Sequence, residues 1–283
     1  MRRRAAAVAL LLLPVLGVSE DVAVAGVAVP AGARADLGPL DARHGVRPAS
    51  TAVDKLGGDL EGKVVVIDPG HQLGNHHFPR RIRLPVPAGG FTKPCNTTGT
   101  ATNGGYPEAT FAWQVSQLVA ARLRELGATV RLTRQSNRQD RWGPCVDVRG
   151  RAGNATPSRP AADLKLSIHA DGSYAAGARG FHVIAPPDRA PWTADIHRPS
   201  RRLATSVKAG LRSQRFGVAT YTAGGDGIDV RADLATINLS DVPTVMVELG
   251  NMRSPSEARV MTSPPGRARY ARGLVSGVRR FLG

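Results

Sequence analysis

The sequence contains few cysteine, aromatic and acidic residues, and it has no long apolar run. Its 283 residues include two Cys, and Phe, Trp and Tyr together make up 5%. Two Cys cannot form a disulfide-dense small scaffold. Few aromatic side chains means few stacking surfaces for bases, and no nucleic-acid-binding motif is present, so we expect no nucleic acid partner. The main apolar run, Ala5 to Val18, is shorter than the roughly 18–20 residues that cross a bilayer, so we expect no membrane span.

The N-terminus has the features of an export signal. Arg2 to Arg4 precede the apolar run, and Ala23-Val24-Ala25 fits a cleavage site. We therefore expect residues 1–25 to be a signal peptide and the protein to be secreted, to the periplasm or the cell wall. Residues 26–61 have no sustained apolar period and predict a linker or N-terminal arm. Residues 62–283 then form one domain.

Strand-like and helix-like segments alternate along this domain. The β-branched run at 63–67 predicts a strand that ends at Asp68-Pro69-Gly70. Alternation of this kind predicts an α/β fold: a single domain with a largely parallel twisted sheet flanked by helices on both faces. Further strands are expected over 129–132, 163–168, 180–184 and 244–247, helices over 108–126, 146–154, 200–213 and the C-terminus, and long loops over 72–107 and 217–243.

Ionisable residues stand at the ends of these apolar runs. His71, His169 and Glu248 each follow an expected strand, and Glu108 opens the helix after the first long loop. Working groups in open α/β sheets lie just past the carboxyl ends of strands. Two His and a carboxylate are the ligand set of a catalytic zinc. Their long separations match no local metal motif, however, and the alternative is that each His is a satisfied strand-end residue.

Four segments match a known family in order: Val64–His71, Tyr106–Glu108, Leu166–Asp171 and Val245–Asn251. Together they closely resemble the zinc-dependent N-acetylmuramoyl-L-alanine amidases of bacterial cell-wall turnover, over about residues 62–282. The resemblance implies that His71, Glu108 and His169 hold Zn²⁺ and that Glu248 is the catalytic glutamate. It implies hydrolysis of the amide bond between N-acetylmuramic acid and L-Ala in peptidoglycan or muropeptides. The alternatives are a zinc peptidase or carboxypeptidase acting on stem peptides, and a non-catalytic cell-wall-binding protein.

Two positions depart from the family pattern. Asp171 stands where Asn is common, and Asn251 where an aromatic residue is common. Asp171 either orients a zinc-bound His or caps its strand end. Asp68 either shapes the Asp-Pro-Gly turn or helps to orient His71. The neighbouring His76 and His77, in a Pro-rich and Arg-flanked loop, are expected to be exposed.

The two cysteines and the excess of arginine bear on the surroundings of this site. Cys95 and Cys145 are an even pair in an exported chain, so a disulfide that pins the long loop is expected; a catalytic Cys would lack a nearby His. Lys and Arg number 38 against 22 Asp and Glu. The excess reflects either simple solvation or attraction to an anionic cell wall surface. We expect a monomer, because no coiled-coil pattern is present. The Arg clusters are Arg80, Arg81 and Arg83, then Arg198, Arg201 and Arg202, then Arg279 and Arg280.

Overall fold

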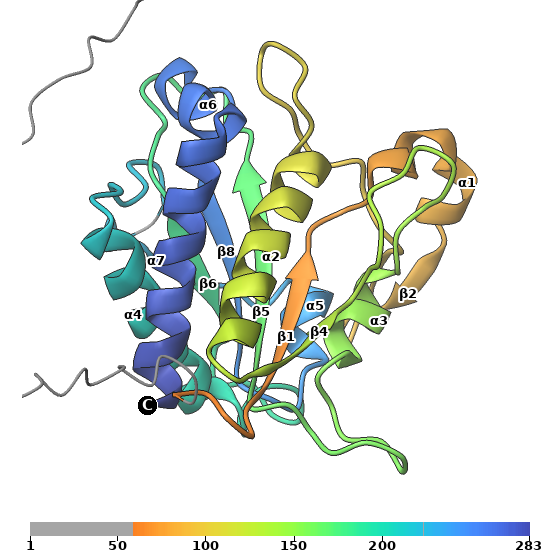
Figure 1. Ribbon diagram of the computed structural model, residues 1–283. Helices are drawn as coiled ribbons and strands as arrows, with labels where there is room; N and C mark the ends of the chain where they lie inside the picture. Colours follow the sequence, from red (N-terminus) through yellow and green to blue (C-terminus); the bar gives the residue numbers. More distant parts are fainter. Residues whose placement is uncertain (1–58, 223) are drawn as a thin grey trace, which may run out of the picture. The chain divides into compact units, whose positions relative to one another are not determined.

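A six-stranded sheet runs through the centre of the structure (Figure 1). The computed structural model describes residues 59–283 except residue 223, so the expected signal peptide and residues 26–58 lie outside the described residues. The strand order is β4-β1-β5-β8-β6-β7, and β4, β1, β5 and β8 are mutually parallel. Only β6 runs antiparallel to its neighbour β8, and β7 pairs in parallel with β6. The strands are β1 (Val64–Pro69), β4 (Thr129–Leu132), β5 (Leu164–Asp171), β6 (His182–Ala185), β7 (Ile228–Val230) and β8 (Thr244–Asn251).

One face of the sheet is apolar and is covered by three long helices. Alternate strand residues such as Ile67, Leu166 and Val247 point to this face and are fully buried. The helices α4 and α7 cross with their backbones nearly in contact. A methyl group added at Gly210 would lie 2.6 Å from the Gly277 nitrogen, so only glycine fits there. The covering helices are α2 (Glu108–Glu125), α4 (His197–Ser213) and α7 (Pro264–Leu282), with the shorter α6 (Pro255–Thr262) before α7.

The other face of the sheet carries polar side chains. The intervening residues of the same strands point here, and many of them are ionisable despite their burial. This face is covered by α3 (Val146–Arg151), α5 (Ala235–Asn238) and the segment 72–107. The polar residues of this face are Asp68 on β1, Lys165, Ser167, His169 and Asp171 on β5, His182 on β6 and Glu248 on β8.

The α/β fold with helices on both faces is confirmed, and the expected main strands and long helices are all present. The expectation that 72–107 and 217–243 are irregular is wrong. Tertiary contacts organise them into elements too short to leave a sequence period. Residues 72–107 contain η1 (Leu73–His77), α1 (Pro79–Ile82) and the hairpin of β2 (Pro85–Pro87) and β3 (Thr92–Pro94), and residues 217–243 contain β7 and α5.

The periodicity of α2 also misplaces one residue. Its apolar spacing predicts that Leu118 is buried together with Phe111 and Val115. Leu118 is instead 40% exposed, while Leu123 takes a place in the core. In the part of the chain that the structure describes, no helix combines the length and apolar character that crossing a membrane requires.

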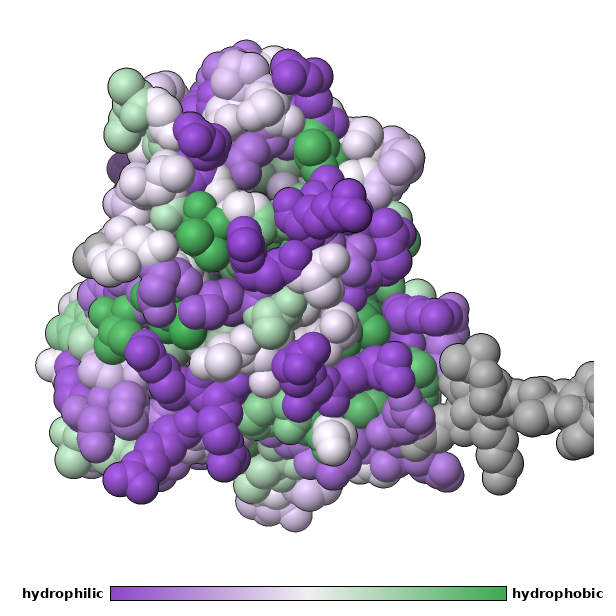
Figure 2. All heavy atoms as spheres, turned by 90° about the vertical axis from the view of Figure 1, so that its left-hand side faces the viewer, coloured by the Kyte–Doolittle hydropathy of each residue, from purple (hydrophilic) through white to green (hydrophobic). Residues whose placement is uncertain are grey.

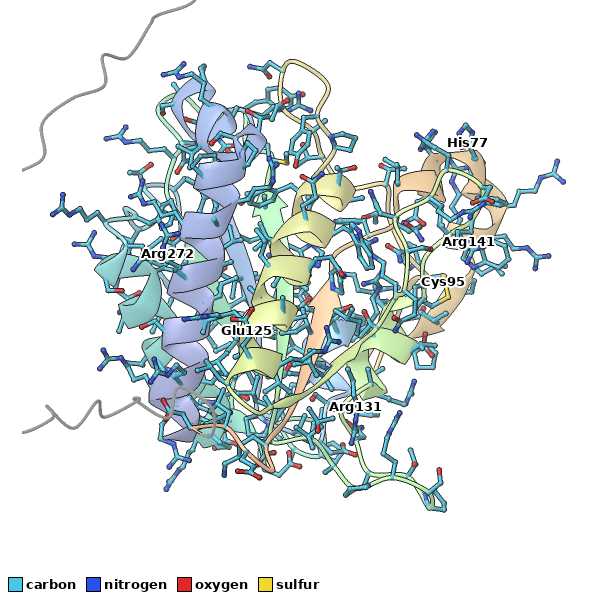
Figure 3. All side chains as sticks on the ribbon, in the orientation of Figure 1. His77, Cys95, Glu125, Arg131, Arg141 and Arg272 are labelled. Carbon is cyan, nitrogen blue, oxygen red and sulfur yellow. A yellow bond between two sulfur atoms is a disulfide. The ribbon has the colours of Figure 1, made fainter. Side chains whose placement is uncertain are left out.

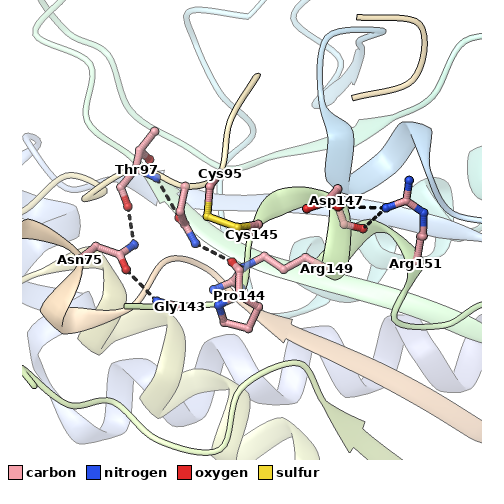
Figure 4. The surroundings of a disulfide bond; sticks show 10 residues. Asn75, Cys95, Thr97, Gly143, Pro144, Cys145, Asp147, Arg149 and Arg151 are labelled. Atoms are coloured by element: carbon pink, nitrogen blue, oxygen red, sulfur yellow. Dashed lines mark hydrogen bonds and ion pairs between the residues drawn. A yellow bond between two sulfur atoms is a disulfide. The ribbon is translucent and has the colours of Figure 1, made fainter. Parts of the chain in front are cut away.

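The disulfide between Cys95 and Cys145 is confirmed and fastens the segment 72–107 to the start of α3 (Figure 4). Hydrogen bonds surround it: Asn96 Nδ2 donates to the Pro144 carbonyl at 2.7 Å, and Val146 N donates to the Cys95 carbonyl at 2.7 Å. Asn75 links η1 to both sides of the bridge, because its Nδ2 donates to the Thr97 carbonyl and its Oδ1 accepts from Gly143 N. The covering segment is therefore held on the polar face at several points.

Replacing both cysteines by serine is expected to lower the free energy of unfolding by about 2–4 kcal/mol, because the bridge closes a sequence separation of 50 residues. Urea unfolding of the double variant against wild type measures this. Equal stabilities, or two free thiols in the exported wild-type protein, would contradict the structural role of the bridge.

Candidate metal centre

His71, Glu108 and His169 converge at the C-terminal edge of the polar face. Glu108 Oε1 lies 3.1 Å from His71 Nε2 and 2.9 Å from His169 Nδ1. One ligand atom from each of the three residues falls within 4.8 Å of the others, which suits a metal ion. The three come from distant parts of the sequence: the loop after β1, the first turn of α2, and β5. The long sequence separations left open whether these three residues meet, and the fold brings them together.

The imidazole of His71 is oriented by the loop that precedes α2. His71 Nδ1 lies 3.1 Å from the carbonyl oxygen of Thr97, which can only accept a hydrogen bond. We therefore assign an Nδ1–H that donates to this carbonyl, so Nε2, which is directed at Glu108, is the ring atom left to bind a metal ion. Metal-bound histidines are commonly fixed in this way, through a hydrogen bond from the other ring nitrogen to a carbonyl.

Glu108 is held by backbone donors as well as by the two histidines. Its Oε2 accepts from Thr100 N at 2.9 Å, and its Oε1 accepts from Ala170 N at 3.2 Å. Burial alone would raise the pKa of Glu108, but His71 and His169 outweigh it and hold the pKa well below its usual range. Glu108 is therefore ionised at neutral pH, as a metal ligand has to be.

Two glycines leave the room that these rings and the carboxylate occupy. A methyl group added at Gly70 would lie 2.5 Å from the His169 ring. One added at Gly99, whose φ is +76°, would lie 2.8 Å from Glu108 Oε2 and 2.9 Å from the His71 ring. The donor set, the assigned His71 tautomer and this close packing together fit a small cation.

Glu248 faces the same site without belonging to the ligand cluster. It pairs across the sheet with His169 on β5 and with His182 on β6, so the three side chains form a row on the polar face. Its Oε2 is buried and accepts no hydrogen bond from the described residues. Burial, followed by the charges of Glu108 and Asp171, raises the pKa of Glu248 well above its usual value. All four predicted residues line one cavity of about 350 Å³.

Within residues 59–283, the hydrogen bonds of the Asp68 side chain go neither to the Asp-Pro-Gly turn nor to the side chains of His71 and His169. Its carboxylate is fully buried and accepts from Arg149 Nη1 at 2.6 Å, Ser167 Oγ at 2.7 Å and Thr133 Oγ1 at 2.5 Å. Burial would raise the pKa of Asp68, but Arg149 and the two hydroxyls hold it far below its usual range. Asp68 therefore forms a fully satisfied buried ion pair with Arg149.

Arg149 carries the influence of this ion pair to His71. The same guanidinium donates to the Pro69 carbonyl at 2.7 Å and to the His71 carbonyl at 2.6 Å. His71 has a positive φ of 55°, which is unfavourable for a residue with a Cβ. The hydrogen bond from Arg149 thus helps to hold the backbone that aims the His71 ring.

Two further buried cations fasten the same region. Arg134 donates to the carbonyls of Gly70 at 3.2 Å and Ala109 at 2.8 Å, which joins the His71 loop to the first turn of α2. Lys165 Nζ donates to the carbonyls of Arg149 at 3.1 Å and of Gly150, which fixes the end of α3. Burial lowers the pKa of Arg134 to about 9 and that of Lys165 to about 7.

The remaining candidates lie as follows. Asp171 Oδ1 accepts from Gly172 N at 2.9 Å, as a strand-end cap does, and the residue lines the cavity beside Glu248. His76 and His77 are exposed, with ring centres 3.9 Å apart and ring planes tilted by 43°, and His77 lies at the outer edge of the η1 region (Figure 3). Sequence reasoning missed Arg134, Arg149 and Thr97, because a contact across tens of residues leaves no local pattern.

Comparisons with known proteins agree with this geometry. The family model for N-acetylmuramoyl-L-alanine amidase matches residues 65–280. The N-acetylmuramoyl-L-alanine amidase Rv3717 of Mycobacterium tuberculosis (strain ATCC 25618 / H37Rv) is 41% identical over 238 residues, which cover 83% of this chain and 92% of that protein. The chain therefore belongs to the N-acetylmuramoyl-L-alanine amidase family, as the four sequence segments indicate.

Two solved structures are also similar. The crystal structure of the apo form of the amidase Ami1 from Mycobacterium abscessus superposes with a TM-score of 0.71 at 40% identity, covering 79% of this chain and all of that one. Ami1 from Mycobacterium smegmatis gives a TM-score of 0.71 at 38% identity, covering 79% of this chain and 98% of that one. The α/β domain described above is thus the amidase fold.

Replacing Asp68 by Asn is expected to lower the free energy of unfolding by about 3–5 kcal/mol at pH 7, because it leaves Arg149 buried without a counter-charge. The pKa of Asp68 is depressed in the folded state, so its contribution is fully present above the ordinary value of 3.8 and is lost as the pH falls below it. The difference between variant and wild type should therefore shrink in acid. Urea unfolding at pH 7 and pH 3 measures both effects.

The matched control is Glu125→Gln, which breaks an exposed pair with Arg122 on the surface of α2 (Figure 3). It should change stability by less than about 1 kcal/mol. A difference for Asp68→Asn that grows as the pH falls would contradict the assigned ion pair.

Proposed function

We propose that this chain hydrolyses the amide bond between N-acetylmuramic acid and L-Ala with a zinc ion held by His71, Glu108 and His169. The observation that carries the proposal is the convergence of these three donors in one cavity with Glu248, whose Oε2 has no partner among the described residues. Two nitrogens and one carboxylate oxygen are typical of catalytic zinc sites, which keep one position open. When bound, the ion lowers the pKa of a water ligand from about 15.7 toward 7 and polarises a carbonyl group.

Glu248 is proposed to move the proton. As the carboxylate, it would accept a proton from the water that attacks the lactyl carbonyl carbon. It would then donate that proton to the amide nitrogen as the carbon–nitrogen bond breaks. The products are a free carboxylate on the muramic acid and a peptide with a free L-Ala amine. The position of Glu248 opposite His169 on the neighbouring strand supports this role, because it is close to the ligands yet outside their cluster.

The site's surroundings support an exported enzyme. A disulfide that pins the cavity wall is typical of oxidising compartments. We propose, with the N-terminal signal expected from the sequence, that the chain acts outside the cytoplasm, in the periplasm or the cell wall. The donor set alone favours neither polymeric peptidoglycan nor soluble muropeptides as the substrate.

The basic surface is proposed to hold the enzyme near its substrate. We define the basic corner as Arg80, Arg81, Arg83, Arg138 and Arg141, all exposed. The loop that bears Arg141 packs against η1 at Gly74, and the Arg81 guanidinium lies 5.4 Å from the ring centre of the partly exposed Trp142. Arg141 points outward there in Figure 3. Arg198, Arg201 and Arg202 are exposed residues of α4. The side of the molecule drawn in Figure 2 has hydrophilic side chains between apolar groups.

Replacing Glu248 by Gln is expected to leave zinc bound near wild-type stoichiometry and to reduce turnover of a muramyl peptide by about 10²–10⁴-fold, the usual contribution of a general base. His169→Ala should lose both metal and turnover, because it removes a ligand. Metal analysis and a turnover assay on the same preparations test this. His77→Ala, which changes an exposed histidine outside the site, is the control and should keep both. Near-wild-type turnover in Glu248→Gln would refute the assigned role.

Retention on isolated cell walls is expected to weaken as salt is raised from 0.05 to about 0.5 M, because screening shortens the reach of exposed charges. Replacing Arg80, Arg81 and Arg83 together by Gln should weaken retention at low salt more than the same triple change at Arg198, Arg201 and Arg202. A sedimentation assay with walls measures both. Retention that ignores salt would rule out the electrostatic role of the basic corner.

A further inference from the structure

A second hollow, of about 440 Å³, lies beside the catalytic cavity. Three segments build it: the loop before α2 with Asn103, the loop after β5 with Tyr174 and Arg179, and the loop after β8 with Arg253. Each of these loops adjoins an element that carries a residue of the site, namely Glu108 on α2, His169 on β5 and Glu248 on β8. Asp171 and Gly172 line the catalytic cavity, and the next residues, Ser173 and Tyr174, line the hollow. The two hollows therefore adjoin along this loop.

The hollow presents an aromatic ring to solvent. Tyr174 is 80% exposed, the highest value among the large apolar and aromatic residues that the structure describes as exposed. The Arg253 guanidinium lies over its ring, 4.7 Å from the centroid. A cation over an aromatic face is attracted by the electron density of the ring, so this contact holds the ring in place. Most of the Tyr174 side chain remains open to solvent and is available to a ligand.

The loop that bears Tyr174 is fastened rather than loose. Asn251, which is 2% exposed, donates from Nδ2 to the carbonyls of Ser173 and Ala178, both at 2.9 Å. Its Oδ1 accepts from Arg253 N at 3.0 Å, so one buried amide joins the loops on both sides of the ring. A methyl group added at Gly172 would lie 2.2 Å from Thr100 Oγ1, so the third segment packs closely as well. Asn251, at a position where the family commonly has an aromatic side chain, thus helps to hold the loops on both sides of the Tyr174 ring.

The polar groups around the ring can bind a hydroxylated ligand. Asn103 Oδ1 and the Arg253 guanidinium face each other at 3.4 Å, and Arg253 Nε is buried with no acceptor among the described residues. An amide and a guanidinium supply donors and an acceptor for hydroxyl and acetamido groups. The C–H face of a pyranose ring packs on an aromatic face, whereas the small and charged side chains of a wall stem peptide offer no comparable flat surface.

We propose that this hollow is a glycan subsite, in which Tyr174 stacks against an amino-sugar ring of the glycan strand next to the muramic acid whose amide is cut. The inference rests on the proposed amidase function and adds to it a basis for preferring polymeric substrate. Residues of the subsite bind the sugar and take no part in the chemical step. The enzyme would then bind both the muramic acid whose amide is cut, at the cavity, and the glycan that extends from it.

The test compares two substrates that carry the same peptide: muramyl dipeptide, with one sugar, and a tetrasaccharide of alternating N-acetylglucosamine and N-acetylmuramic acid. The quantity measured is the ratio of their kcat/KM values per cleavable bond. In wild type the ratio should favour the tetrasaccharide, and Tyr174→Ala should reduce it by about tenfold, in line with the loss of one aromatic stacking contact. Tyr174→Phe should keep the ratio, because it keeps the ring. Phe91→Ala, which removes a 39% exposed aromatic side chain on the β2–β3 hairpin, should also keep it.

The outcomes separate the two proposals. If wild type cleaves neither substrate, the proposed function fails. If wild type cleaves both and Tyr174→Ala leaves the ratio unchanged, the subsite is refuted while the amidase function stands. A wild-type kcat/KM that is the same for both glycan lengths but rises when the stem peptide is lengthened, with the rise lost in Tyr174→Ala, would assign the hollow to peptide and would also overturn the inference.

Discussion

The buried ion pair between Asp68 and Arg149 is the constraint on which the geometry of the site depends. Placing two charges inside a protein is costly, and the cost is offset only when every donor and acceptor is satisfied. Here Ser167 and Thr133 complete the carboxylate, and the guanidinium uses its other donors on the backbone of Pro69 and His71. A single pair therefore fixes the end of β1 against β5 and α3. The unfavourable backbone of His71 is held in place as a result.

The two faces of the sheet have different roles. The apolar face, under α2, α4 and α7, contains most of the core and stabilises the fold. The polar face, under short elements and a disulfide-pinned segment, holds buried ionisable groups that a hydrophobic covering could not satisfy. Because the two faces alternate along every strand, one strand such as β5 contributes Ile168 to the core and His169 to the candidate metal centre. Stability and chemistry are in this way placed on the same strands without competing for the same positions.

The sequence predicts the parts of this arrangement that repeat or that mark an end. The β-branched run of β1, the helix of α2 and the place of His71 after β1 are local signals, and each is found where it was expected. His169 and Glu248 do not follow their strands as expected but lie within them, because the pairing of β5 with β8 continues to Asp171 and Asn251. The elements of 72–107 are too short to have a period. The helical period of α2 does not show how far α7 covers that helix, so the exposure of Leu118 is not predicted. Arg149, Arg134 and Thr97 act on residues far away in the chain. Their roles follow from folding geometry, which a single sequence does not display.

The most direct test of the account is mass spectrometry of the products formed from muramyl dipeptide by the mature chain, with and without a metal chelator. The account predicts release of intact L-Ala–D-isoGln with a free amino terminus, lost on chelation and restored when zinc is returned. Release of single amino acids from larger muropeptides would contradict the bond assigned here, and undiminished cleavage after complete removal of metal would contradict the role of His71, Glu108 and His169.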